Sequence, residues 1–134
     1  EEEFNKYINS IIVDDVVVIE GTVNKEQAGR PPSLRASYIE SMDTYLEKFS
    51  DKLLINVNEE SLNTDIIENL KTILIKNESG NTQINLDITS RNSKARFHLG
   101  ADWGVKINMG AMIDLNTLFS SDNISIVFKN KQNL

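Results

Sequence analysis

The chain has 134 residues and a formal net charge of −6, with 40% hydrophobic and 25% charged residues. This length and balance predict one folded domain, or two small ones, and argue against intrinsic disorder. The sequence has no cysteine and one histidine, which excludes disulfides, cysteine nucleophiles and most zinc sites. No apolar run approaches the length of a membrane span, so we expect a soluble, cytoplasmic chain. We also expect the chain to hold no metal or cofactor.

The charge is spread unevenly along the chain. Residues 1–57 carry 11 acidic and 6 basic side chains, a balance of −5, whereas residues 58–134 carry 9 and 8, a balance of −1. Nucleic-acid-binding proteins usually present a basic face, because counterion release supplies much of their affinity. The acidic first half therefore argues against tight DNA binding by this chain alone, but it leaves room for a local basic patch.

Residues 1–50 carry patterns for a helix, two strands and a connector. A stripe at helical spacing predicts a first helix, ended by Asp14-Asp15 and formed by Phe4, Tyr7, Ile8, Ile11 and Ile12. Residues 16–23 and 34–39 predict two strands, because they are rich in β-branched residues or alternate in polarity. Their connection is long for a hairpin, which makes it a candidate functional loop. Residues 41–52 predict a short helical or irregular connector.

Residues 51–134 show a more regular rhythm. Apolar runs and period-two alternation predict strands at 53–57, 84–88, 95–99 and 124–128. Helical spacing predicts helices at 62–74 and 109–119, the second capped by Asn108. The order strand, helix, strand, strand, helix, strand is the split βαβ or ferredoxin-like pattern, with two helices on one face of an antiparallel sheet. We therefore expect an α+β chain.

Two glycine-containing segments qualify this outline. Ser79-Gly80-Asn81 is expected to end the first of these helices, and Trp103, Val105 and Ile107 are expected to continue the strand alternation past a bend at Gly100. The segment from Gly100 to Gly104 does not lie between a strand and a helix. A strand bend therefore explains its glycines better than a phosphate-binding loop does.

The chain offers little chemistry for catalysis. It contains no P-loop, GxGxxG, GxSxG or HExxH motif. His98 shares the polar face of its strand with Lys94 and Arg96, and together with Arg91 they make a small basic strip. We interpret this strip as a solvated outer face, in preference to a phosphate-contacting patch. Trp103, the only tryptophan, is either a core residue or an interface anchor.

Three stretches resemble a known family. The run Glu2-Glu3-Phe4-Asn5-Lys6-Tyr7, followed by a strand that ends in Gly21-Thr22-Val23, resembles the later part of the OB domain of bacterial replicative DNA polymerase III alpha subunits. Residues 94–103 (KARFHLGADW) resemble the C-terminal signature of that family, in which basic and apolar residues alternate before Gly-Ala-x-Trp. A following amphipathic helix and a short final strand occur there in the same order.

The resemblance implies a C-terminal fragment of a DNA-directed DNA polymerase (a nucleotidyltransferase of DNA replication), with the catalytic domains and the first OB strands upstream of Glu1. Residues 1–50 would be the C-terminal part of an OB-fold, its hairpin and helix. Residues 51–134 would be a ferredoxin-like βαββαβ domain that docks the tau subunit of the clamp loader. The fragment itself would be non-catalytic.

The resemblance also assigns two sets of candidate residues. The tau-docking set consists of Trp103, Met112, Ile126 and Phe128, on an edge strand, a helix and an aromatic anchor. The loop at 24–33 would correspond to the OB loop that contacts single-stranded DNA, which assigns a DNA contact to Lys25, Arg30 and Arg35. The stacking aromatic residues of the family have no match here, and each stacked base is worth about 1–3 kcal/mol.

Three further interpretations stay open. Half a barrel exposes strand edges, so residues 1–50 are expected to pack on the second domain or to form a strand-swapped homodimer. One rival function is a ferredoxin-like regulatory module that binds a small metabolite in a pocket lined by Gly100 and Gly104. The other is an independent single-strand-binding protein, which would need salt-dependent DNA affinity from an acidic chain.

Overall fold

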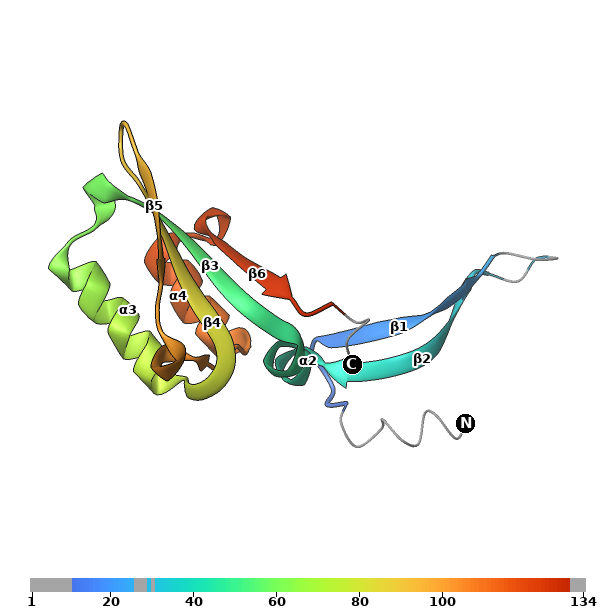
Figure 1. Cartoon of the computed structure of the whole chain (residues 1–134). Helices are drawn as coiled ribbons and strands as arrows, with labels where there is room; N and C mark the ends of the chain where they lie inside the picture. Colours follow the sequence, from blue (N-terminus) through green and yellow to red (C-terminus); the bar gives the residue numbers. More distant parts are fainter. Residues whose placement is uncertain (1–10, 26–28, 30, 131–134) are drawn as a thin grey trace. The chain divides into compact units, whose positions relative to one another are not determined.

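The computed structural model of the chain describes residues 11–25, 29 and 31–130. The chain divides into two compact units, residues 1–45 and 46–134, and the division lies within helix α2 (Met42–Phe49). The first unit contains a two-stranded sheet, and the second contains a four-stranded sheet with two longer helices (Figure 1). Helix α2 confirms the helical connector expected at 41–52.

The first unit is built on strands β1 (Val17–Asn24) and β2 (Ser33–Ser41), which pair antiparallel with an irregularity between Glu20 and Gly21. Both expected strands are confirmed. Ile11 and Ile12 lie outside any helix, because the backbone turns there, with Asp15 N–H donating to the Ile12 carbonyl at 3.1 Å. The rest of the helix expected from the first stripe lies outside the described residues.

The second unit follows the expected order of strands and helices. Its strands are β3 (Ser50–Asn58), β4 (Glu78–Thr89), β5 (Lys94–His98) and β6 (Ile124–Phe128). Its helices are α3 (Thr64–Lys76) and α4 (Met109–Phe119). Three short 3-10 turns complete it: η2 (Glu59–Ser61), η3 (Ala101–Trp103) and η4 (Ser121–Asn123).

Asparagine side chains start both longer helices. Asn63 accepts from Ile66 N–H at 2.9 Å, and Asn108 accepts from Ala111 N–H at 2.8 Å. Each side chain thus satisfies one of the backbone donors that the first helical turn leaves free. The cap predicted at Asn108 is confirmed.

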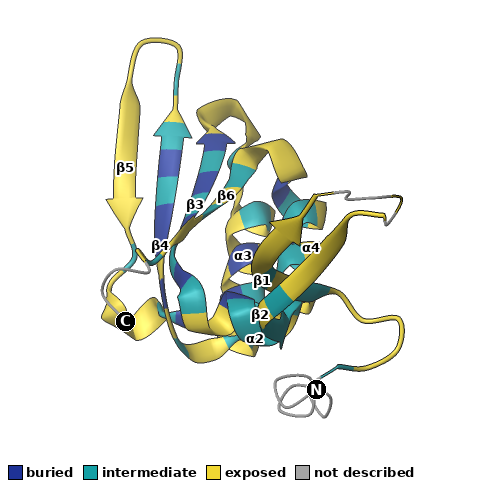
Figure 2. Cartoon of the chain, turned by 90° about the vertical axis from the view of Figure 1, so that its right-hand side faces the viewer, coloured by how far each residue is buried: buried dark blue, intermediate teal, exposed yellow. Residues whose placement is uncertain are grey.

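The α+β class is confirmed, but the strand order differs from the ferredoxin-like pattern. The sheet runs β5-β4-β3-β6, and β3 pairs with β4 directly and in parallel, whereas a split βαβ unit would place another strand between them. Burial explains the order. Every residue of the five-residue β5 is exposed, which suits a sheet edge, whereas the twelve-residue β4 buries Ile84, Asn85 and Asp87 and suits the centre (Figure 2).

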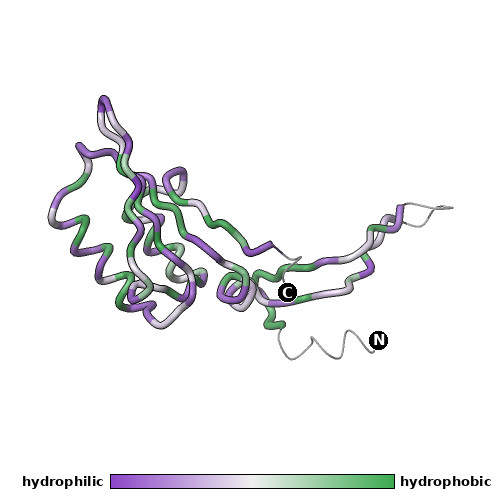
Figure 3. The backbone as a smooth tube through the Cα atoms, in the orientation of Figure 1, coloured by the Kyte–Doolittle hydropathy of each residue, from purple (hydrophilic) through white to green (hydrophobic). Residues whose placement is uncertain are grey.

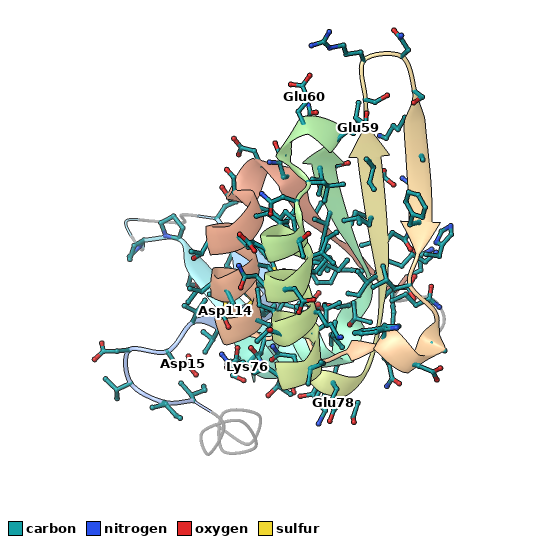
Figure 4. The ribbon with its side chains drawn as sticks, turned by 90° about the vertical axis from the view of Figure 1, so that its left-hand side faces the viewer. Asp15, Glu59, Glu60, Lys76, Glu78 and Asp114 are labelled. Atoms are coloured by element: carbon teal, nitrogen blue, oxygen red, sulfur yellow. The ribbon has the colours of Figure 1, made fainter. Side chains whose placement is uncertain are left out.

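The core of the second unit lies between the sheet and its two helices. Leu53 and Ile55 of β3 lie opposite Ile84 and Leu86 of β4 in the register, and Leu53, Ile55 and Ile84 are essentially inaccessible to solvent. Figure 4 shows α3 and α4 side by side over this face of the sheet, with Lys76 and Asp114 meeting between them. The expectation of two helices on one face is confirmed.

Hydropathy alternates along the strands of the sheet (Figure 3). The face away from the helices is largely polar. The register aligns Asn56, Asp87 and Arg96 in one row across β3, β4 and β5, and aligns Leu54, Asn85 and His98 in the next row. The sheet is therefore one-sided, with the helices covering only its apolar face.

Two local expectations at the glycines are wrong. Helix α3 ends at Lys76, and residues 79–81 lie inside β4, where Ser79 takes a positive φ of 67°. Residues 101–103 form the turn η3 rather than a strand, and Val105 makes only isolated bridges to Glu78 and Thr82. Val105 and Ile107 are nevertheless buried. The alternation of apolar residues in this segment therefore indicates burial, although the segment is not a strand of the sheet.

Within the described residues, no helix is both long enough and apolar enough to cross a membrane. The same part of the chain holds no cluster of three or more histidine, aspartate or glutamate side chains arranged to hold a metal ion.

Candidate partner-binding surfaces

An apolar groove lies between α3 and the β5 side of the sheet. Its volume is about 350 Å³. Leu62 and one face of α3 form one wall, Leu86 and Leu99 come from the sheet side, and Trp103 and Phe119 contribute aromatic rings. Lys71 is the one charged residue among those that line it. A groove with this lining suits an apolar segment of a partner better than a polar metabolite, which needs convergent polar groups.

Trp103 stands at this groove and is 38% exposed. The turn η3 holds it, with Trp103 N–H donating to the Gly100 carbonyl at 2.9 Å. The turn is fixed against the start of β4, where Gly80 N–H donates to the Gly104 carbonyl at 3.3 Å. A side chain on Gly80 would place Cβ within 1.9 Å of the Val105 backbone, so this approach requires glycine.

The other candidate docking residues lie elsewhere on the second unit. Ile126 is half-buried and Phe128 is exposed, and both belong to β6. Two strands separate β6 from β5 in the sheet order, which places these residues at the opposite edge from Phe97 of β5. Met112 is half-buried on α4. The structure thus separates Trp103 at the groove from Ile126 and Phe128 on β6, while Met112 belongs to α4.

The basic strip on β5 is built into cross-strand pairs. Arg96 makes two bonds to Asp87, at 2.6 and 2.7 Å, and Lys94 Nζ lies 3.5 Å from the same carboxylate. His98 Nδ1 lies 2.7 Å from Asn85 Oδ1. Hydrogen bonding to Arg96, followed by the charges of Arg96 and Lys94, outweighs burial and lowers the pKa of Asp87 from 3.8 to about 2.

The Asp87 carboxylate sits beneath its two cationic partners. Its side chain is 4% exposed, whereas the side chains of Arg96 and Lys94 are 50% and 59% exposed. The same hydrogen bond raises the pKa of Arg96. The surface of this strip is therefore positive, because the compensating negative charge lies below it.

The candidate DNA-contacting residues belong to the first unit. Lys25 is exposed just after β1, and Arg35 is exposed on β2, opposite Thr22 in the register. Arg30 lies outside the described residues. The strands confirm a hairpin that carries a long connection between residues 24 and 33.

Two features of these surfaces were not predicted from the sequence. The Asp87–Arg96 pair could have been found, since a hairpin turning at residues 90–93 brings position 87 opposite position 96. The groove could not, because its lining comes from α3, β4, α4 and the segment that follows β5, which the strand order of the sheet brings together. No periodicity in the sequence gives that strand order.

Comparison with known proteins gives a distant relationship. The chain is 21% identical over 127 residues to the DNA polymerase III subunit alpha of Vibrio cholerae serotype O1. The match covers 95% of this chain and 11% of that protein. No family model matches the sequence. The chain is thus similar, along nearly its whole length, to a short segment of a much longer DNA polymerase subunit.

Proposed function

We propose that this chain is a non-catalytic C-terminal region of a DNA polymerase III alpha subunit, and that its second unit docks the polymerase to the tau subunit of the clamp loader. The parent protein would be a DNA-directed DNA polymerase acting in the cytoplasm, with its active site outside the region that this chain represents. The distant similarity to the Vibrio cholerae subunit supports the replication role. The observation that carries the docking proposal is the exposed Trp103 beside an apolar groove.

Trp103 and its groove have the features of a binding hot spot. A partly exposed aromatic ring over an apolar cavity can remove a large area from water when a partner closes over it. Ile67 on the groove wall is 55% exposed, so the wall also offers apolar area that the chain itself leaves in water. A helix or loop of tau that inserts an apolar side chain here would bury both.

The β6 edge supplies a second contact in this proposal. Phe128 is 45% exposed, and Ile126 lies two residues before it on the same strand. Met112 on α4 belongs to the same proposed set. We expect this surface to contribute less than the groove, because none of its three proposed residues, Met112, Ile126 and Phe128, lines the groove.

The direct test is a titration of the full chain with the C-terminal segment of a tau subunit, followed by the fluorescence of Trp103. The chain has one tryptophan, so the change reports the groove alone. Saturable binding that shifts the emission is the expected result. Calorimetry that detects no heat of binding at tens of micromolar of either component would contradict the proposal.

Two variants on one helix give a matched control. Ile67→Ser changes the groove wall, whereas Ile75→Ser changes a residue of α3 with similar exposure, 50%, that does not line the groove. We expect Ile67→Ser to weaken tau binding by about tenfold, the effect of losing an interface contact worth about 1.4 kcal/mol. Ile75→Ser should bind tau as tightly as the unsubstituted chain does.

We also propose that the first unit contacts single-stranded DNA through Lys25, Arg30 and Arg35, which lie in its long loop or on the strand that follows it. Its basic side chains are the support for this role, and the acidic balance of residues 1–57 limits its strength. The triple substitution to serine should abolish binding of an oligothymidylate at low salt. Unchanged binding, or binding that is insensitive to salt, would contradict this role.

The first unit is also proposed to exchange strands with a second copy of the chain. Ile19, Val23 and Leu34 are all at least 45% exposed, in a sheet that has two strands among the described residues. Isolated two-stranded hairpins are marginally stable in water. Light scattering should show a dimer of the chain. A monomer whose hairpin is readily cleaved by protease would contradict strand exchange between two copies.

A further inference from the structure

The open edge of β5 has backbone groups in a defined pattern. Leu99 N–H donates to the Ile84 carbonyl at 3.0 Å, and Ser90 N–H donates to the Ser93 carbonyl at 2.8 Å. Hydrogen-bonded and non-bonded pairs alternate along an antiparallel ladder. The pairs Leu86–Phe97 and Ile88–Ala95 therefore belong to the hydrogen-bonded set, like the two pairs above. Phe97 and Ala95 turn their backbone N–H and carbonyl groups toward β4.

The intervening residues turn the other way. Lys94, Arg96 and His98 direct their backbone N–H and carbonyl groups away from β4, and β5 has no second neighbour in the sheet of the described chain. Such an edge is a template for another strand. Figure 2 shows β5 at the border of the sheet and exposed along its length.

The two faces of β5 differ in chemistry. The exposed cationic heads of Lys94 and Arg96 stand on the polar face of the sheet. Phe97, which is 52% exposed, stands on the other face, where it lies opposite Leu86, a residue that lines the apolar groove. An incoming strand would thus meet positive charge on one face and apolar surface on the other.

We propose that β5 accepts an extended segment of a partner protein as a fifth strand of the sheet, and that this segment alternates acidic and apolar residues. Side chains directly opposite each other in neighbouring strands share a face, so acidic residues would meet Lys94 and Arg96. The other, apolar residues of the segment would lie beside Phe97, on the face of the sheet that carries the groove-lining Leu86. Backbone bonds would give affinity, and the alternation would give selectivity.

This inference does not depend on the proposed binding of tau, and the experiment that tests it contains no tau. The probe is a fluorescein-labelled synthetic heptapeptide in which glutamate alternates with isoleucine, titrated with the full chain and followed by anisotropy. We expect saturable binding that weakens by about tenfold or more when lysine replaces glutamate, because like charges then face each other across the strands.

Methylation of backbone nitrogens distinguishes strand addition from side-chain contact. Alternate amides of a strand point to opposite edges, so N-methylation of one alternate set should abolish binding and N-methylation of the other set should leave it within about twofold. Equal effects of the two sets would overturn the proposal.

Matched variants locate the site on the protein. Phe97→Ser should weaken peptide binding by about tenfold, whereas Val127→Ser, an exposed apolar position on the other edge strand, should not change it. Equal loss in both variants would overturn the assignment to β5, as would no binding of the peptide by the folded parent chain. Oligothymidylate binding that Phe97→Ser removes, without peptide binding, would assign the strand to nucleic acid instead.

Discussion

The two units of this chain contain strands of similar composition, but they differ in whether those strands bury apolar side chains. In the second unit, β3 and β4 bury Leu53, Ile55 and Ile84 beneath two helices. In the described part of the first unit, no apolar side chain is buried, although β1 and β2 are just as rich in β-branched residues. A pattern of strand-forming residues therefore predicts a strand, but stability comes from the layer that covers it.

The largest expected effect comes from the core of the second unit. Leu53→Ala should lower the free energy of unfolding by about 2–5 kcal/mol, because it leaves a cavity at a fully buried position. Val23→Ala on β1, where the side chain is 66% exposed, should change it by about 0.5 kcal/mol or less. Urea unfolding measures both. Comparable losses would mean that the hairpin belongs to the same cooperative core.

The glycine contact behind Trp103 gives the next effect. Gly80→Ala should cost about 1–3 kcal/mol, because its Cβ would lie 1.9 Å from the Val105 backbone and the segment must move. It should also alter the emission of Trp103. Gly100→Ala is the matched control, since a Cβ there meets nothing within 4 Å. Equal stability of the two variants would show that the approach of the segment to β4 does not fix the turn.

The cross-strand pair on β5 predicts a pH effect confined to the second unit. The pKa of Asp87 is about 2 in the folded chain, below the ordinary 3.8, so ionisation of Asp87 favours the folded state. This contribution is fully present above the unfolded value and is lost as the pH falls from about 4 to about 2. Unfolding of Asp87→Asn should lose this part of the pH dependence. An unchanged profile in that window would contradict the pairing.

Much of the second unit could be predicted from particular residues. Alternation of Ile124, Ile126 and Phe128 gave β6 with its observed bounds, and Asn108 gave the start of α4. Strand order could not be predicted, because it depends on which strand lies in the centre of the sheet. The turn at Trp103 was also missed, since the close approach of Gly80 and Gly104 joins segments that are distant in sequence.

The candidate sites show the same division. The family resemblance assigned Trp103 and Phe128 to partner docking, but it could not show that these residues lie on separate surfaces. Sequence patterns placed Lys94, Arg96 and His98 on one polar face correctly. They did not show that Asp87 lies beneath two of these side chains, since that depends on the register of β4 with β5.

Hydrogen exchange of the full chain, with and without the C-terminal segment of tau, tests the docking proposal most directly while comparing both units in one experiment. We expect slower exchange in α3 and in residues 97–103 when tau is bound, with β1 and β2 unchanged. Protection confined to β1 and β2, or no protection at saturating tau, would contradict the assignment of partner docking to the groove beside Trp103.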